Sequence, residues 1–99
     1  MHYVYVLESF KDCSWYIGST SDIKRRIGEH NSGNSGFTNQ HRPYKLLCYI
    51  GLPLKSDAER FEGYLKSGYG RRILKNMIRD YLKSKGGFIY GEKNKQNYN

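Results

Sequence analysis

Cysteine is scarce in this sequence, and no apolar run is long enough to cross a bilayer. The two cysteines, Cys13 and Cys48, lie in different segments without metal-ligand spacing, which argues against a disulfide scaffold and a zinc site. We expect them to be free thiols in a reducing compartment. A spanning helix needs roughly 20 apolar residues, and no signal-peptide pattern opens the chain. The sequence therefore predicts a soluble cytoplasmic protein with no membrane partner.

Acidic residues are also few. Nine Asp and Glu stand against seventeen Lys and Arg, so the formal net charge is +8. This charge favours a polyanionic partner, and nucleic acid is the first candidate. At 99 residues, 37% of them hydrophobic, the chain has room for one domain with a modest core. Ten tyrosines are a high share for such a core; packing is the commoner role of a tyrosine, but phenols also stack on bases and move protons.

Three segments have the composition of β-strands. Residues 2–7 and 15–18 are rich in β-branched and aromatic side chains and flank a turn-like stretch, which predicts a β-hairpin. Residues 44–52 form the third candidate, between Pro43 and Pro53.

Alternation divides the first strand into two faces. Tyr3, Tyr5 and Leu7 point to one side of the sheet. Val4 and Val6 point to the other side. One face therefore carries consecutive phenols.

Capping residues and glycines divide the rest of the chain into helices. Residues 19–22 supply capping residues and an early acid for a first helix, which is predicted to run to about Asn31 and to be closed by Gly33. Ser56 and Asp57 are expected to cap a second helix that runs to about residue 67. A third helix, whose apolar residues recur at helical spacing, is expected to end at Gly86.

The predicted order is β-β-α-β-α-α. This order corresponds to an α/β fold of the α+β type, with a small three-stranded antiparallel sheet flanked by helices. Residues 1–87 are expected to form one domain, and the polar residues 88–99 a flexible C-terminal tail. Residues 31–42, rich in Gly, Ser and Asn, are expected to form a mobile loop that contacts substrate.

The first helix carries polar side chains on its apolar face. Ile23 and Ile27 lie only about 40° apart around the helix axis and define the buried stripe. Arg26 and His30 fall inside this stripe, whereas Arg25 falls outside it. A guanidinium that faces the sheet needs a partner, because burying it unpaired is costly.

The second helix has a similar anomaly. Ala58, Phe61 and Leu65 form its apolar stripe, and Glu62 lies within it. One interpretation is that Arg26 and Glu62 pair with each other or extend to the rim of the core. The alternative is that these residues converge with the phenols above one sheet and form a site that hydrolyses phosphodiesters. The carboxylate would then hold a metal, the arginine would bind developing charge, and a phenol or imidazole would accept a proton.

These residues resemble the pattern of the GIY-YIG nuclease superfamily. Its two tyrosine elements correspond to Tyr3-Val4-Tyr5 and to Tyr16-Ile17-Gly18, and the resemblance covers roughly residues 2 to 85. The first element has Tyr3 where the family has Gly, and Asn76 lies near a late family Asn without a certain register. Short stand-alone bacterial members, similar to the nuclease domain of the excision-repair incision subunit, resemble the chain most.

The resemblance implies a metal-dependent DNA endonuclease that acts in repair or processing of DNA structures. It implies that Tyr5 or Tyr16 is the general base, that Arg26 grips the scissile phosphate and that His30 assists proton transfer. Glu62 would bind one divalent ion, Mg²⁺ or Mn²⁺.

Two other functions share much of this pattern. A catalytically silent DNA- or RNA-binding module could keep the fold, and a basic structural protein bound to RNA would explain the charge and the aromatics. The expected partner is DNA, bound by a monomer or a weak homodimer. The candidate DNA contacts outside the catalytic centre are Lys24, Arg25, Arg42, Lys45 and Lys66.

Overall fold

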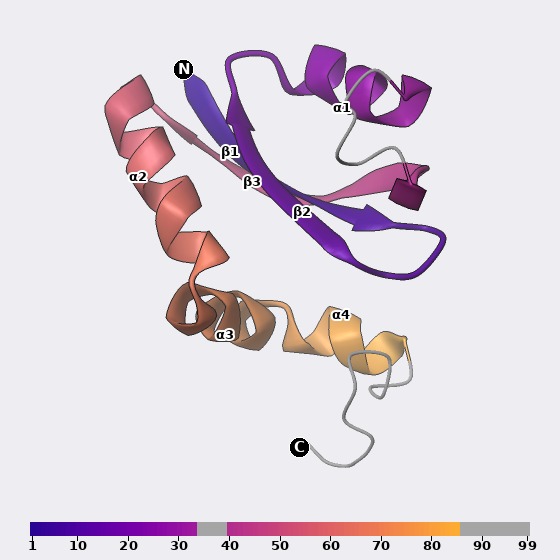
Figure 1. Cartoon of the computed structure of the whole chain (residues 1–99). Helices are drawn as coiled ribbons and strands as arrows, with labels where there is room; N and C mark the ends of the chain where they lie inside the picture. Colours follow the sequence, from indigo (N-terminus) through magenta and orange to yellow (C-terminus); the bar gives the residue numbers. More distant parts are fainter. Residues whose placement is uncertain (34–39, 86–99) are drawn as a thin grey trace.

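A three-stranded antiparallel sheet lies between helices on both of its faces (Figure 1). The computed structural model describes residues 1–33 and 40–85, so half of the predicted mobile loop and the whole predicted tail lie outside the described residues. The strands are β1 (His2–Ser9), β2 (Trp15–Thr20) and β3 (Tyr44–Leu52), arranged β2-β1-β3. The predicted α+β fold is confirmed. No helix among the described residues is long and apolar enough to span a membrane.

Strand β1 is central because its side chains are apolar or aromatic on both faces. Val4 and Val6 belong to one buried cluster, and Tyr5 and Leu7 belong to the other. The register shifts between Val6 and Leu7 where β1 pairs with β3. A bulge of this kind twists a strand locally and redirects the side chains that follow.

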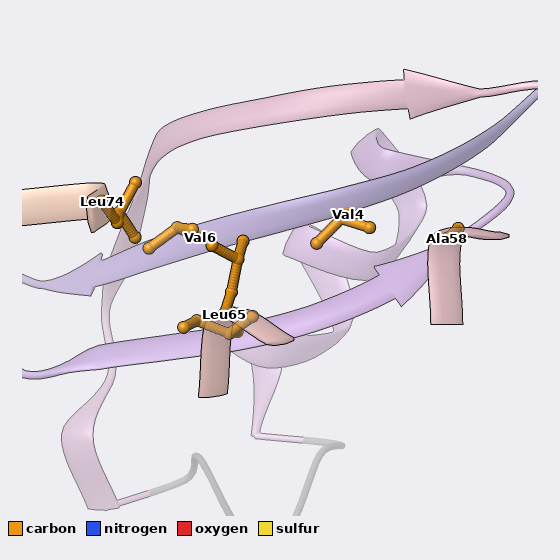
Figure 2. Close-up of a cluster of buried hydrophobic side chains, with 6 residues drawn as sticks. Val4, Val6, Ala58, Leu65 and Leu74 are labelled. Carbon is orange, nitrogen blue, oxygen red and sulfur yellow. The ribbon is translucent and has the colours of Figure 1, made fainter. Parts of the chain in front are cut away.

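The larger core lies between the sheet and the helices α2 (Lys55–Lys66) and α3 (Gly68–Met77). Figure 2 shows the side chains of Val4 and Val6 beside those from the two helices. The helical members of this cluster are Ala58, Leu65 and Leu74. Burial of these apolar groups holds both helices against one face of the sheet.

Helix α1 (Ile23–Ser32) covers the opposite face of the sheet (Figure 1). The side chain of Asp22 accepts a hydrogen bond from the backbone N–H of Arg25 at 3.1 Å, and so caps the first turn. Gly33 ends the helix with a φ of 87°, a conformation that glycine adopts without steric cost. Both predicted boundaries of this helix are confirmed.

The predicted cap of α2 is wrong. The helix begins at Lys55, and its N-cap residue is Leu54, which makes no side-chain cap. Asp57 therefore lies inside the first turn, where its negative charge interacts favourably with the helix dipole. It also pairs with Arg60 at 2.8 Å.

The predicted third helix is two helices. It breaks at Ile78 (φ −114°, ψ 27°) into α3 and the short α4 (Arg79–Ser84), whereas Gly86, the predicted end, lies outside the described residues. The break brings Tyr81 and Lys85 to the end of β1, where both bind Glu8. Their hydrogen bonds to this carboxylate account for the change in chain direction between α3 and α4.

Glu8 is a completely buried carboxylate, with 0% of its surface exposed. It accepts hydrogen bonds from the indole Nε1 of Trp15 at 3.1 Å, from the Tyr81 hydroxyl and from Lys85 Nζ at 2.7 Å. Lys45 Nζ lies 3.7 Å away. We call these five residues the Glu8 anchor. It joins the end of β1 to the start of β3 and to α4, so it fixes the last described helix against the sheet.

Candidate active site

Four of the predicted site residues gather on the face of the sheet that α1 covers. Tyr5 comes from β1, Tyr16 from β2, and Arg26 and His30 from α1. The Tyr5 hydroxyl and His30 Nε2 are 3.0 Å apart, which is a hydrogen-bond distance. The ring of Tyr16 lies 4.6 Å from that of His30 and 6.3 Å from that of Tyr5, measured between centroids.

Gly18 makes room for this arrangement. It lies directly opposite Tyr5 in the β1–β2 register, on the same face of the sheet. A Cβ atom at Gly18 would lie 2.6 Å from the Tyr5 hydroxyl oxygen and 3.1 Å from a ring carbon of Tyr16. The absent side chain therefore lets the Tyr5 ring lie across β2 and carry its hydroxyl to His30.

The electrostatic environment keeps Tyr5 protonated. Burial is the main cause that raises the pKa of Tyr5 to about 12, and the charges of Tyr16 and Glu62 raise it further. The Arg26 guanidinium, within hydrogen-bonding reach of the phenol, acts in the opposite direction. Burial and the charge of Arg26 also lower the pKa of His30, so the imidazole is neutral near pH 7. A neutral imidazole beside the phenol can accept its proton.

Arg26 has the partner that the helix pattern required, and this partner is in its own helix. Its Nη1 atom lies 2.7 Å from Glu29 Oε1, and its side chain is 31% exposed. Glu29 also binds Arg25 at 2.7 Å. One carboxylate therefore holds two arginines, of which only Arg26 also reaches Tyr5. The guanidinium is held toward the phenol while still accessible to a ligand.

Glu62 comes from α2, which packs on the other face of the sheet. Its side chain is 21% exposed and pairs with Lys66 at 2.7 Å. Among the described residues Glu62 and Arg26 form no ion pair with each other, so the predicted pairing of the two inward charges is wrong. Both side chains are partly exposed, which agrees with the other possibility, extension to the rim of the core. The negative charge of Glu62 makes the smallest of the contributions to the pKa of Tyr5, which it raises.

The donor set at Glu62 fits a hydrated divalent ion. No group of three or more His, Cys, Asp or Glu within residues 1–33 and 40–85 could enclose a metal. Mg²⁺ and similar ions do not need such a group, because one or two carboxylates, waters and substrate phosphates commonly complete their coordination. A half-buried single carboxylate is compatible with this mode of binding.

The candidate DNA contacts outside the centre fall into two groups. Lys24, Arg25 and Arg42 have exposed side chains. Lys45 lies near the buried Glu8, between the rings of Phe10 and Tyr81, and Lys66 pairs with Glu62. The side chains of the first group are open to solvent and to a ligand, although Arg25 also pairs with Glu29. The lysines of the second group lie beside carboxylates that are buried or half-buried.

Sequence analysis missed two residues that hold the site together. Asn31 Nδ2 donates to the backbone carbonyl of Tyr44 at 3.1 Å, and Asn31 Oδ1 accepts from the backbone N–H of the same residue at 2.6 Å. This two-way bond ties the end of α1 to the start of β3. The ring of Tyr44, only 5% exposed, lies edge-on to His30 at 6.1 Å. The position of Asn31 directly after His30 was the available signal.

Several proteins of known sequence are similar to this chain. A UPF0213 protein of Halalkalibacterium halodurans is 44% identical over 66 residues, which cover 66% of this chain and 69% of that protein. A UPF0213 protein of Streptococcus pneumoniae is 43% identical, and the match spans 65% of its length. The structure-specific endonuclease subunit SLX1 of Phaeosphaeria nodorum is 33% identical over 82 residues, which cover 77% of this chain and 22% of that protein.

The chain also resembles a solved structure and matches a family model. A solution NMR structure of the UPF0213 protein from Bacillus halodurans is 39% identical and covers 77% of this chain and 83% of that chain, with a TM-score of 0.49. Residues 1–77 match the family model described as the GIY-YIG catalytic domain. This match includes all five predicted site residues and every strand of the sheet. The chain therefore belongs to the GIY-YIG family of nucleases.

Proposed function

We propose that this protein is a divalent-metal-dependent endonuclease that hydrolyses phosphodiester bonds in DNA. The observation that carries the proposal is the environment of one phenol. The Tyr5 hydroxyl is bonded to His30, lies within reach of Arg26 and experiences the charge of Glu62. A proton donor and acceptor, a cation and a carboxylate are the groups that phosphodiester hydrolysis requires.

Each side chain has a task in this proposal. Arg26 binds the scissile phosphate and offsets the charge that develops on it, since its guanidinium can donate two parallel hydrogen bonds. His30 exchanges a proton with Tyr5 across their 3.0 Å contact. Tyr5, which is protonated at rest, can accept the proton of the attacking water only as its own proton passes to His30. Tyr16 is the other candidate for this role, and it is only half-buried and reaches solvent more easily than Tyr5.

Glu62 is the proposed metal ligand. A bound Mg²⁺ or Mn²⁺ would stabilise negative charge on the phosphate and on the leaving oxygen. For the ion to bind, Lys66 must release the carboxylate, and its ammonium is then available for the DNA backbone. The exposed Lys24, Arg25 and Arg42 are proposed as further backbone contacts.

A single centre of this kind cuts one strand at a time. A monomer can therefore nick DNA, and cutting both strands requires a weak homodimer or a second encounter. We place this activity in the repair or processing of DNA structures in the cytoplasm. The similarity to SLX1, a structure-specific endonuclease subunit, supports this assignment.

Cleavage assays with the whole chain test the proposal. Supercoiled, branched and single-stranded DNA are incubated with Mg²⁺ or Mn²⁺, and the proposal expects nicking that EDTA stops. Glu62→Gln should abolish cleavage and keep DNA binding, whereas Glu59→Gln, at an exposed position of the same helix, should cut normally. A wild-type chain that binds these substrates but leaves them intact is the silent binding module instead.

A further inference from the structure

Two tyrosines of β1 each lie over a glycine of a neighbouring strand, one on either side of β1. Tyr5 lies over Gly18 of β2, as described above. Tyr3 lies over Gly51 of β3, where an added Cβ atom would be 2.9 Å from its Cε1 atom. Tyr3 and Gly51 face each other in the β1–β3 register. Consecutive phenols on one face of the sheet therefore point to opposite sides, and only Tyr5 points toward the candidate active site.

Tyr3 lies beside an open groove between α1 and β3. The groove has a volume of about 500 Å³. Its walls include Tyr3, Leu46 and Tyr49 from the sheet and Ile23, Lys24 and Ile27 from α1. Five of these six side chains are aliphatic or aromatic.

The aromatic wall of this groove faces solvent. Tyr49 is 57% exposed and Leu46 is 37% exposed, although both lie on the face of the sheet that α1 partly covers. The rings of Tyr3 and Tyr49 meet edge to face, 5.9 Å apart and at 69°. This contact fixes the orientation of Tyr49 while its ring remains open to a ligand. A fixed, exposed aromatic ring can stack on a planar molecule at little cost in side-chain entropy.

Charge identifies the class of ligand. The chain carries a net charge of +8, and Lys24 is one of the residues that line the groove. The one acidic side chain of the lining, Asp22, already binds the backbone N–H of Arg25 and lies 3.9 Å from its guanidinium. An apolar, aromatic groove with a cation beside it matches a nucleobase attached to its phosphate.

The groove adjoins the candidate active site. Tyr49 lies directly opposite Tyr5 in the β1–β3 register, and Ile27 packs against the cluster that contains Tyr5. Helix α1 thus presents Ile23 and Ile27 to the groove and Arg26 to the phenol. A DNA strand whose phosphate meets Arg26 has its neighbouring nucleotides close to Tyr49.

We propose that this groove binds an unpaired nucleobase of the DNA substrate, stacked on Tyr49. The inference rests on the proposed function and specifies its substrate as DNA that contains unpaired nucleotides. A base within a duplex is covered on both faces by its neighbours, so only an unpaired base can use the ring. Stacking on aromatic side chains tolerates any base, so the groove selects single-stranded character and not a sequence.

Binding measurements without divalent metal test the groove separately from cleavage. Fluorescence anisotropy compares a single-stranded oligothymidine with a blunt-ended duplex that contains no unpaired nucleotides, both in EDTA and at low salt. Tyr49→Ala should weaken binding of the oligothymidine by about 5- to 150-fold, and binding of the duplex should hardly change. Tyr49→Phe should bind like the wild type, since it keeps the ring. Ile50→Ala is the matched control, because its side chain is 45% exposed on the opposite face of the same strand.

Cross-linking gives a second readout. Irradiation of a bromodeoxyuridine-substituted oligonucleotide should attach it to Tyr49 or Tyr3, as peptide mass spectrometry would show. Equal affinity of wild type and Tyr49→Ala for the single strand would overturn the inference, as would a wild type that binds neither DNA. If the chain cuts DNA but Tyr49→Ala loses no affinity, the groove inference alone fails. If the chain cuts nothing but shows the expected affinities, the groove stands and the catalytic proposal fails.

Discussion

Replacing Gly18 by alanine should damage both the stability and the activity of this protein. The new methyl group would lie 2.6 Å from the Tyr5 hydroxyl oxygen and 2.8 Å from its Cζ atom. Tyr5 cannot move aside easily, because only 1% of its surface is exposed and its hydroxyl is bonded to His30. The substitution therefore requires either a displaced ring or a displaced strand.

Two opposing effects set the size of the stability change. Overpacking of a core costs about 1–3 kcal/mol. Replacing a glycine by alanine also lowers the entropy of the unfolded chain, which stabilises the fold by about 0.4–1 kcal/mol. The overpacking is the larger effect, so the free energy of unfolding should fall by on the order of 1–2 kcal/mol. A domain of this size loses about 4–8 °C in Tm for each kcal/mol.

Thermal unfolding followed by circular dichroism measures this change, and Gly28→Ala is the control. Gly28 lies in α1, and a Cβ atom there would meet nothing within 4 Å. The same substitution should therefore raise stability, by about 1 kcal/mol from helix propensity. Nicking by Gly18→Ala should fall by about 100-fold or more, since the pairing of Tyr5 with His30 is disturbed. A Gly18→Ala variant with wild-type Tm and wild-type nicking would refute this account of the Tyr5 environment.

Three further predictions concern the anchor, the imidazole and the charge. Glu8→Gln should lower the free energy of unfolding in urea by about 3–5 kcal/mol, because the cations around this buried carboxylate lose their partner; Glu59→Gln, in an exposed pair, should change it by less than about 1 kcal/mol. Burial lowers the pKa of His30 from 6.5, so on acidification the unfolded chain protonates this imidazole before the folded chain does, and the free energy of unfolding falls as the pH drops below about 6.5. His30→Asn should make the free energy of unfolding, measured by urea titration, depend less on pH in this range. An unchanged pH dependence would contradict the lowered pKa of His30. DNA affinity should fall steeply with salt, and Lys24→Ala should reduce the slope of log affinity against log salt by about 0.9 if its ammonium meets a phosphate; an identical slope would remove Lys24 from the interface.

The sheet and the first helix could be predicted because local signals there agree with the tertiary contacts. β-Branched and aromatic alternation defined β1, the two prolines bounded β3, and Asp22 and Gly33 bounded α1. The inward positions of Arg26 and His30 also followed from helical spacing, and the structure has His30 fully buried and Arg26 half-buried.

The helices after β3 were harder to predict because long-range contacts shape them. Apolar spacing favoured one continuous third helix, but the chain turns at Ile78 so that α4 can reach Glu8. The same spacing suggested a continuous buried stripe, yet Met77 is 75% exposed. Glu8 itself gave no signal as a buried group, since a carboxylate in an alternating strand normally faces water. Two of its partners, Tyr81 and Lys85, lie more than 70 residues away.

That separation in sequence has a consequence for how the chain folds during its synthesis. The hairpin of β1 and β2 leaves the ribosome early, but the ammonium of Lys85 that neutralises Glu8 is among the last described residues to emerge. Translation adds about 5–20 residues per second, so the carboxylate waits several seconds for its cation. Until Lys85 arrives, burial of Glu8 would remove its carboxylate from water without the ammonium that balances its charge in the folded protein. The nascent chain should therefore stay open at this end and complete its core only when α4 arrives.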